Sequence, residues 1–245
     1  YPMKQAIYAF GLATATFTTA LSAQDASPVE ENDTLELEEL TLQSSTETGT
    51  TYYSDAPVST ATKLGLSILE TPQSISVITQ EQLDDFALDN LNAALRYAPG
   101  INVESVETDR TYYTARGFDI TNFQIDGLGL PLVFGNIAGN LDSAIYEEVQ
   151  VLRGANGLAT GSGNPSATIN LIRKRPTAEF QGSIEAVYGS WDKKRVVADI
   201  SSPLNEAGSI RGRIVSAYQE GESYLDRYSS ERSTFYGIVE ADLTD

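Results

Sequence analysis

The chain has 245 residues, a formal net charge of -18 at pH 7 and a sequence pI near 4.3. This length allows one or two domains, and the acidic balance argues against a nucleic-acid partner, which would require clustered Lys and Arg. The sequence contains no Cys and no His, which excludes disulfides, thiolate or imidazole metal ligands and catalytic triads with a His base. Because no pair of carboxylates stands in a recognisable catalytic setting either, the protein is not expected to be an enzyme.

The first 23 residues have the layout of a secretory signal peptide. Lys4 precedes an apolar run over residues 6–21, which ends in small residues and is followed by acidic ones. The run is short for a membrane-spanning helix. We therefore predict export with residues 1–23 as the signal, and we expect residues 1–2, which precede Met3, to be non-native.

Residues 24–69 are rich in Ser, Thr, Glu, Asp and Ala, a composition that predicts a flexible tail. The stretch 33–43 differs from its surroundings, because its leucines form two short period-2 patterns on either side of Glu38 and Glu39. A segment of this kind can add as a strand to the sheet of another protein. The alternative is a solvated acidic linker with scattered leucines.

A strand and a helix are predicted next. Ile75 and Val77 alternate with serines, as in a short strand. Thr79 then offers a hydroxyl for a helix N-cap, and Gln82 follows it at the spacing of a capping box. A helix is therefore expected to begin at Thr79.

A second helix is predicted over residues 89–98, because Pro99 and Gly100 end an amphipathic pattern there. Its apolar face carries Leu91, Ala94 and Leu95. From residue 101 to 174 the sequence changes to short strand-like runs and Gly-rich loops. Residues 70–176 therefore predict a compact α+β domain.

Beyond residue 176 four strand-like runs cover residues 180–189, 195–202, 209–220 and 234–244. In the last run Phe235, Gly237, Val239, Ala241 and Leu243 share one face and polar residues dominate the other. A longer polar loop is predicted over residues 224–233. Alternating strands of about 9 to 11 residues suit a tilted bilayer crossing. A soluble β-sandwich would show the same alternation and is the alternative.

Residues 151–176 read VLRGANGLATGSGNPSATINLIRKRP, and this segment closely resembles the end of the plug domain in TonB-dependent siderophore receptors. Matches to other plug motifs follow in the expected order. They are Thr71-Pro72-Gln73-Ser74-Ile75, Leu95-Arg96-Tyr97-Ala98-Pro99-Gly100-Ile101, Arg116-Gly117-Phe118 and Ile125-Asp126-Gly127. The resemblance implies an α+β plug domain over residues 70–176, followed by the first antiparallel strands of a transmembrane β-barrel.

The family's barrel has 22 strands, whereas residues 177–245 supply about four. An open sheet of that size would leave unpaired backbone groups facing lipid. The expectation is therefore a truncated barrel, from a fragment or a shortened gene.

The resemblance also implies a function, the import of a ferric siderophore across the outer membrane of a Gram-negative bacterium. The expected siderophore is of the hydroxamate type. The TonB protein, with its inner-membrane energising complex, would bind a TonB box in the periplasmic tail. The best candidate for this box is Glu39, Leu40, Thr41, Leu42 and Gln43. Outer-membrane lipid is the other expected partner. The alternatives are a receptor of the same superfamily for cobalamin, a sugar or a peptide, and an exported soluble binding domain.

Arg116 matches the Arg-Gly-Phe position that lies near the ligand in related receptors, so it is the first ligand-binding candidate. A buried ion pair within the plug is the alternative role for Arg116. Tyr112, Tyr113 and Phe134 are aromatic candidates from their loop positions, with ordinary packing as the alternative for each. No cofactor and no protein metal ligand are expected, because the iron would arrive already chelated. The basic stretch at residues 173–175 is expected either to pair with acidic residues of the barrel wall or to mark a periplasmic turn.

Overall fold

The computed structural model describes residues 58, 60–62, 66, 68, 70–107, 109–130, 137–155, 157–160 and 163–243. The chain divides into two units, residues 1–45 and 46–245, and the described residues all belong to the second. The predicted signal peptide, the predicted TonB box at residues 39–43 and Phe134 lie outside the described residues.

The first strand and helix form where the sequence predicted them. Strand β1 spans Ser74–Thr79 and helix α1 spans Gln80–Asp85. The backbone N–H of Gln82 donates to the Thr79 hydroxyl at 3.5 Å, and the Thr79 N–H donates to the Gln82 side-chain oxygen at 3.2 Å. This reciprocal pair is the predicted capping box, and it satisfies two N–H groups that would otherwise lack a partner.

Helix α2 spans Leu91–Tyr97 within the predicted range. The Asn90 side chain caps it by accepting a hydrogen bond from the Ala93 N–H at 2.9 Å. The predicted apolar face is confirmed, since Leu91, Ala94 and Leu95 are all buried. The helix ends because Ala98, which precedes a proline, takes an extended conformation.

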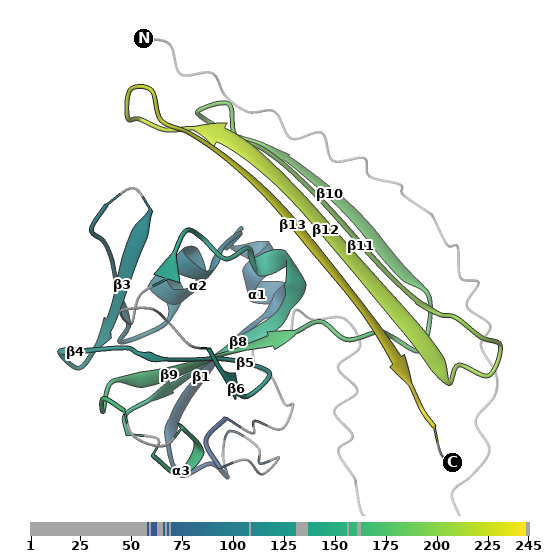
Figure 1. The fold of residues 1–245 in the computed structure, drawn as a ribbon, viewed down its shortest axis with the longest axis horizontal. Helices are drawn as coiled ribbons and strands as arrows, with labels where there is room; N and C mark the ends of the chain where they lie inside the picture. Colours follow the sequence, from purple (N-terminus) through teal and green to yellow (C-terminus); the bar gives the residue numbers. More distant parts are fainter. Residues whose placement is uncertain are drawn as a thin grey trace, which may run out of the picture. The chain divides into compact units, whose positions relative to one another are not determined.

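The centre of the α+β domain is a five-stranded sheet in the order β1-β8-β9-β5-β6 (Figure 1). Its other members are β8 (Tyr146–Arg153), β9 (Ala167–Arg173), β5 (Asn122–Ile125) and β6 (Leu128–Gly129). The pairing of β5 with β9 is parallel, and the other pairings are antiparallel. The sheet thus brings strands from distant parts of the sequence together.

A second, smaller sheet joins three strands, with a fourth paired to the middle one. It contains β2 (Asn102–Ser105), β3 (Arg110–Ala115), β4 (Phe118–Asp119) and β7 (Ile137–Ala138), of which β7 pairs with β3. A single turn of 3-10 helix, η2 (Ser143–Ile145), precedes β8, and the short helix α3 (Gly157–Thr160) follows it.

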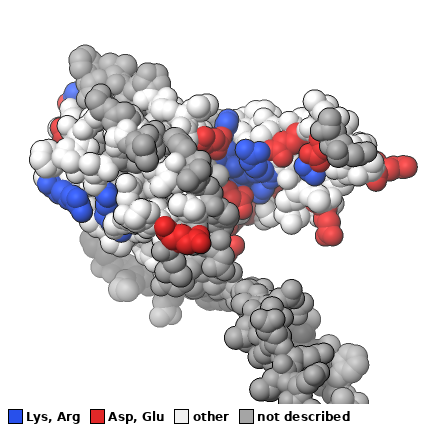
Figure 2. Space-filling view, turned by 90° about the horizontal axis from the view of Figure 1, so that it is seen from below, with Lys and Arg blue, Asp and Glu red and all other residues white. Residues whose placement is uncertain are grey.

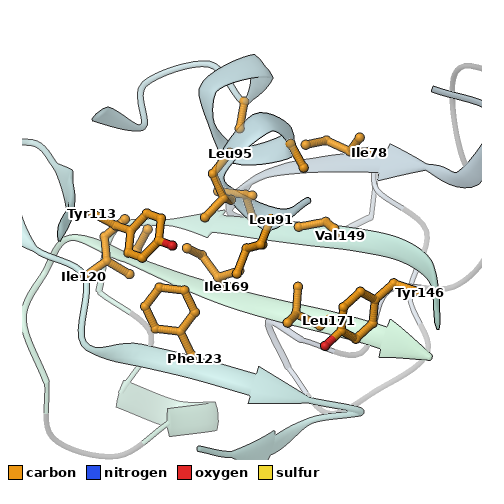
Figure 3. Close-up of a cluster of buried hydrophobic side chains, with 14 of the residues drawn as sticks. Ile78, Leu91, Leu95, Tyr113, Ile120, Phe123, Tyr146, Val149, Ile169 and Leu171 are labelled. Atoms are coloured by element: carbon orange, nitrogen blue, oxygen red, sulfur yellow. The ribbon is translucent and has the colours of Figure 1, made fainter. Parts of the chain in front are cut away.

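The core of this domain lies where α2 packs onto the central sheet. Figure 3 shows Leu91 and Leu95 of α2 lying over Val149 of β8 and Ile169 of β9. Phe123 of β5 completes the layer from the neighbouring strand. Burying each such side chain contributes about 1.5 to 3 kcal/mol.

The segment ahead of β1 is tied to the centre of the sheet by a buried polar contact. The Thr60 side chain is 1% exposed, and its hydroxyl accepts a hydrogen bond from the Asn170 amide at 2.8 Å. The same hydroxyl donates to the side-chain oxygen of Gln150. The central strand β9 and its neighbour β8 are thereby joined to a residue that precedes β1.

The remaining strands form a separate four-stranded antiparallel sheet, the C-terminal sheet, in the order β10-β11-β12-β13 (Figure 1). They span β10 (Gln181–Tyr188), β11 (Lys194–Pro203), β12 (Ile210–Glu222) and β13 (Ser229–Ala241). Within the described residues, no helix is both long and apolar enough to cross a bilayer.

The two faces of the C-terminal sheet differ as predicted. In β13 the side chains of Phe235 and Val239 are exposed, and those of Tyr236 and Ile238 are half-buried. Exposed apolar side chains continue this outward face across the neighbouring strands. They include Ile184, Val196, Ile200 and Ile214. An apolar patch of this extent marks a surface that contacts lipid or another protein.

The predicted loop over residues 224–233 is wrong in its second half. Strand β13 already begins at Ser229, which pairs with Glu222 of β12. The residues from 229 to 233 are polar and read as a loop, but backbone pairing with β12 continues through them. Ladder hydrogen bonds use main-chain groups, so polar side chains do not end the strand.

Candidate functional site

The α+β domain and the C-terminal sheet meet through a buried carboxylate, Asp142, which caps η2. Its oxygens accept two hydrogen bonds of 2.7 Å from the guanidinium of Arg195 in β11. A third comes from Nε of Arg232 in β13 at 3.1 Å. The side chains of Asp142 and Arg195 are only 2% and 6% exposed. A paired, two-point contact of this kind fixes both position and orientation.

Asp142 is ionised when it makes this contact. Burial by itself would raise the pKa of the Asp142 carboxyl, but the hydrogen bonds from Arg195 and from the Ala144 N–H lower it. The positive charges of Arg195 and Arg232 lower it further, so the pKa lies below the ordinary value of 3.8. The carboxylate therefore stays charged throughout the physiological pH range.

A second buried cluster surrounds Asp199 of β11. Its carboxylate accepts from the Lys174 ammonium at 2.9 Å and from Arg213 of β12 at 2.8 and 2.7 Å. The Asp199 side chain is 8% exposed. Arg213 also donates to the backbone oxygen of Arg175 at 2.9 Å. Lys174, at the end of the α+β domain, is therefore bound to β11 through Asp199, which Arg213 of β12 also contacts.

The three residues of the basic stretch at 173–175 thus pair with different parts of the protein. Lys174 pairs with Asp199, and Arg175 pairs with Glu240 of β13 at 2.7 Å. Arg173 instead pairs with Asp126 of the α+β domain at 2.6 Å. Of the two roles predicted for this stretch, pairing with acidic residues of the strands is the one observed for Lys174 and Arg175.

Between the two charged clusters the contact is apolar. Val197, Val215 and Ala217 of the sheet are buried, and Ala144 and Ile145 of η2 pack against them. A small cavity of about 90 Å³ adjoins this contact and is lined by residues of both parts. Figure 2 shows basic and acidic side chains lying next to one another on one face of the molecule, amid a mostly uncharged surface.

Arg116, the first ligand-binding candidate, sits at the tip of a tight hairpin. Arg116 and Gly117 have φ angles of 56° and 82° and connect β3 to β4, with Ala115 paired to Phe118. Two successive positive φ angles define a type I′ turn. Arg116 is exposed, and it makes no ion pair within the part of the chain that the structure describes. The alternative role of a buried ion pair therefore does not apply to the described residues.

The aromatic candidates have different environments. Tyr113 is 2% exposed, its ring centroid lies 5.3 Å from that of Phe123, and its hydroxyl donates to the Asn92 side chain. Burial raises the pKa of Tyr113 to about 12. Tyr112 points to the opposite face of β3 and is half-buried. Tyr113 is thus part of the core, whereas Tyr112 and Arg116 keep exposed surface.

The buried ion pairs were not among the residues that the sequence analysis singled out. The sequence does contain a signal for these ion pairs. Arg195, Asp199 and Arg213 occupy the same strand face as Val197 and Val215, which is the less exposed face of two predicted strands. Charged residues on that face of a membrane strand point away from lipid and need a partner. In the described residues no group of three or more His, Cys, Asp or Glu side chains is arranged to hold a metal ion.

Residues 67–168 match the family model described as TonB-dependent Receptor Plug Domain. The match covers most of the α+β domain and ends within β9, and the C-terminal sheet follows this domain as the barrel strands follow the plug. The chain therefore belongs to the TonB-dependent receptors, with a plug domain and the start of the barrel, as the fold prediction stated.

The similarity to particular receptors is high. The chain is 50% identical over 196 residues to the ferripyoverdine receptor of Pseudomonas aeruginosa, covering 78% of this chain and 24% of that protein. It is 44% identical over 203 residues to the ferric-pyoverdine BN7/BN8 receptor of Pseudomonas putida, covering 82% of this chain and 25% of the relative. The chain thus spans about a quarter of the length of these curated relatives.

Solved structures agree with these relatives. The outer-membrane ferripyoverdine receptor of Pseudomonas aeruginosa bound to ferripyoverdine superimposes with a TM-score of 0.75 at 49% identity, over 79% of this chain and 26% of that one. The alcaligin outer-membrane receptor FauA of Bordetella pertussis gives a TM-score of 0.71 at 49% identity, over 79% and 33%.

Proposed function

We propose that the protein works as a TonB-dependent receptor that imports a ferric siderophore, and that it is a transporter with no enzymatic activity. The observation that carries this proposal is a plug held by buried ion pairs against the less exposed face of an amphipathic sheet. Contacts of this kind hold a plug in place and can still be broken when the plug is pulled. The receptor would lie in the outer membrane, with its tail in the periplasm.

The ligand class is supported by the relatives, whose names include ferripyoverdine, ferric pyoverdines and alcaligin. Among ferric siderophores, the names of the curated relatives favour a pyoverdine complex over the hydroxamate type expected from the sequence. Receptors for cobalamin, a sugar or a peptide are the competing possibility within the superfamily. Iron enters as cargo within the complex, and the mechanism requires no resident cofactor.

Arg116 is the residue best suited to contact such a ligand. Its guanidinium is exposed and can donate several hydrogen bonds to an oxygen-rich, anionic chelate. Tyr112 lies on β3, the strand that leads into the turn carrying Arg116, and keeps part of its surface exposed. The roles of Phe134 and Tyr113 stay predictions, and Tyr113 would first have to leave the core.

Energy would come from the partner protein. TonB would pair with the segment from Glu39 to Gln43 by strand addition, which requires only main-chain hydrogen bonds and an alternating peptide. Pulling on the tail would remodel the plug and open a path for a ligand too large for a passive pore. The residues of this chain then bind and release the complex without chemical change.

Growth under iron starvation tests the proposal. A bacterium with and without this gene would be supplied with a panel of ferric siderophores, including ferripyoverdines, and with cobalamin as a separate arm. Loss of growth on one or more ferric siderophores is expected on deletion. Unchanged growth and uptake on the whole panel would refute siderophore import.

The TonB-box assignment has its own test. Leu40→Pro should abolish uptake of the ferric siderophore and leave its binding intact, because proline cannot donate to a strand ladder. Leu35→Pro, in the first leucine pattern, serves as the matched control and should transport normally. Normal uptake by the Leu40→Pro variant would count against the assignment.

A further inference from the structure

The central sheet of the plug has two unlike faces. Val149 and Ile169 lie on the face beneath α2 (Figure 3). Gln150 and Asn170, the next residues along β8 and β9, therefore face the other way. Gln124 of β5 shares this second face, because the residue before it belongs to the core beneath α2. Both glutamines pair in register with Asn170, so three amide side chains form a polar row across β8, β9 and β5.

The polar row is buried and its hydrogen bonding is incomplete. Gln150, Asn170 and Gln124 are all buried, as is Thr168, two residues before Asn170. Within the described residues, Oε1 of Gln124 and Oγ1 of Thr168 have no hydrogen-bond partner. A buried polar atom without a partner destabilises the covered state, and it gains hydrogen bonds once water reaches it. Water would therefore enter this face more readily than the apolar face beneath α2, whose exposure the hydrophobic effect opposes.

A short segment ahead of β1, the strap, is bound to the polar row. The strap comprises Val58, Thr60 and Ala61, and all three residues are buried. The Thr60 hydroxyl accepts a hydrogen bond from the Asn170 amide at 2.8 Å and donates one to the side-chain oxygen of Gln150. Two of the three amides in the row are thus tied to the strap.

A different kind of contact holds the chain after the strap. Each residue of β1 pairs with β8. Arg153 of β8 donates to the Ser74 and Ser76 hydroxyls at 3.0 and 2.9 Å and to the backbone oxygen of Pro99 at 3.0 Å. Hydrogen bonds from a charged donor are roughly twice as strong as neutral ones. A pull on the chain ahead of the strap therefore reaches the neutral Thr60 contact first and the Arg153 contact afterwards.

We propose that the strap is the part of the plug that lifts under such a pull, and that water then enters along the polar row while the core beneath α2 stays closed. The inference rests on the proposed import by a TonB-dependent receptor, and it specifies which contact opens. Arg153 stops the opening at β1. The polar row makes the opening reversible, because the surface that is uncovered is one that water can solvate.

Single thiols can show which face opens, because this segment contains no Cys. Ala61→Cys reports on the strap and Val151→Cys reports on the core beneath α2, and both native side chains are 0% exposed. Cells that carry the receptor would be supplied with ferripyoverdine and treated with a maleimide, with and without TonB. Labelling of Ala61→Cys should be about tenfold faster when TonB is present, whereas Val151→Cys should be labelled equally slowly in both cells.

A reducible cross-link tests whether the strap has to lift. Thr60→Cys with Asn170→Cys replaces two side chains whose polar atoms lie 2.8 Å apart, and a short cross-linker would hold the strap on the row. Gln150→Cys with Asn170→Cys is the control, because it alters the same row but joins two strands that are already paired. In the cross-linked test receptor, ferripyoverdine uptake should fall about tenfold and its Kd should stay within about twofold. Reduction should restore uptake, and the control should transport equally in both states.

Equal labelling of Ala61→Cys with and without TonB would overturn the role of the strap, as would normal uptake by the cross-linked test receptor. Faster labelling of both cysteines would show that the whole plug opens, which also contradicts the proposal. Failure of the parent receptor to bind or take up any ferric siderophore would instead refute the import function itself.

Discussion

Replacing Asp142 with Asn removes the carboxylate that contacts both Arg195 and Arg232, and it leaves the shape of the side chain almost unchanged. Removing one partner of a buried ion pair costs about 3 to 5 kcal/mol, because the other charge stays buried. Arg195 keeps a hydrogen bond to Gln219 at 3.2 Å, so the lower end of this range, about 3 kcal/mol, is expected. Since each 1.4 kcal/mol is roughly a factor of ten, the plug should separate from the strands about 100-fold more often.

Ala217 provides the reporter for this separation. It is 3% exposed and belongs to the apolar contact beneath Ala144 and Ile145. The chain contains no Cys, so an Ala217→Cys variant carries a single thiol in this segment. When opening and closing are fast, the rate of maleimide labelling measures the population of the separated state. Labelling should be about 100-fold faster when Asp142→Asn is added.

Asp192→Asn is the matched control for this experiment. Asp192 is exposed in the β10–β11 connection and accepts a hydrogen bond from Tyr188, so its replacement should leave labelling unchanged. A labelling rate in the Asp142→Asn variant within twofold of the parent would show that the buried pair does not hold the plug. Equal acceleration by both variants would point to net charge as the cause.

Three further outcomes are expected. Arg116→Ala should weaken siderophore affinity about tenfold in a direct binding assay, and an unchanged Kd would remove Arg116 from the site. Because the pKa of Tyr113 is raised from 10.0 to about 12, its contribution to stability is full below pH 10 and is lost as the pH rises through 12. In urea titrations Tyr113→Phe should lose about 1 kcal/mol of stability at pH 8. The variant should also show a smaller alkaline decline, and the decline that is left comes from Tyr146, whose pKa burial likewise raises to about 12. Gly154→Ala should lower the free energy of unfolding by about 1 to 3 kcal/mol, because its φ is +103° and the added carbon would lie 3.2 Å from an Arg116 nitrogen. Gly157→Ala is the control, because no atom lies within 4 Å of the added carbon there. It should show no comparable loss in the same urea titration.

The elements that could be predicted from the sequence are those fixed by neighbours in the chain. The capping box requires only Thr79 and Gln82, three positions apart, so it could be recognised directly. The two faces of β13 could be recognised because side chains alternate along any strand. The start of β13 at Ser229 could not be predicted, because it depends on pairing with β12 and not on the residues of β13 themselves.

The plug–sheet contact could not be predicted for a similar reason. Asp142 and Arg195 are 53 positions apart, and Lys174 and Asp199 are 25 apart. The sequence contains the charges but does not state which of them meet. A basic stretch in a solvated turn and one in a buried pair have the same composition, so both roles stayed open for residues 173–175.

The adjacent tyrosines of β3 show what the sequence of a single strand leaves undecided, namely which of its two faces is buried. Because side chains alternate, Tyr112 and Tyr113 must point to opposite faces, and only one of them can enter the core. Which one does so depends on how β3 pairs with β2, where Val103 lies opposite Tyr113. Two identical residues in a row carry no signal for that choice.

The buried hydroxyl of Thr60 constrains the order in which the domain can fold. Its partners Gln150 and Asn170 come 90 and 110 positions later in the chain. At synthesis rates of about 5 to 20 residues per second, Thr60 waits on the order of 5 to 20 seconds for Asn170 to be made. Contacts between such distant positions also slow the search for the native state. The contacts that fasten the front of this domain to its sheet can therefore form only after the last central strand has been synthesised.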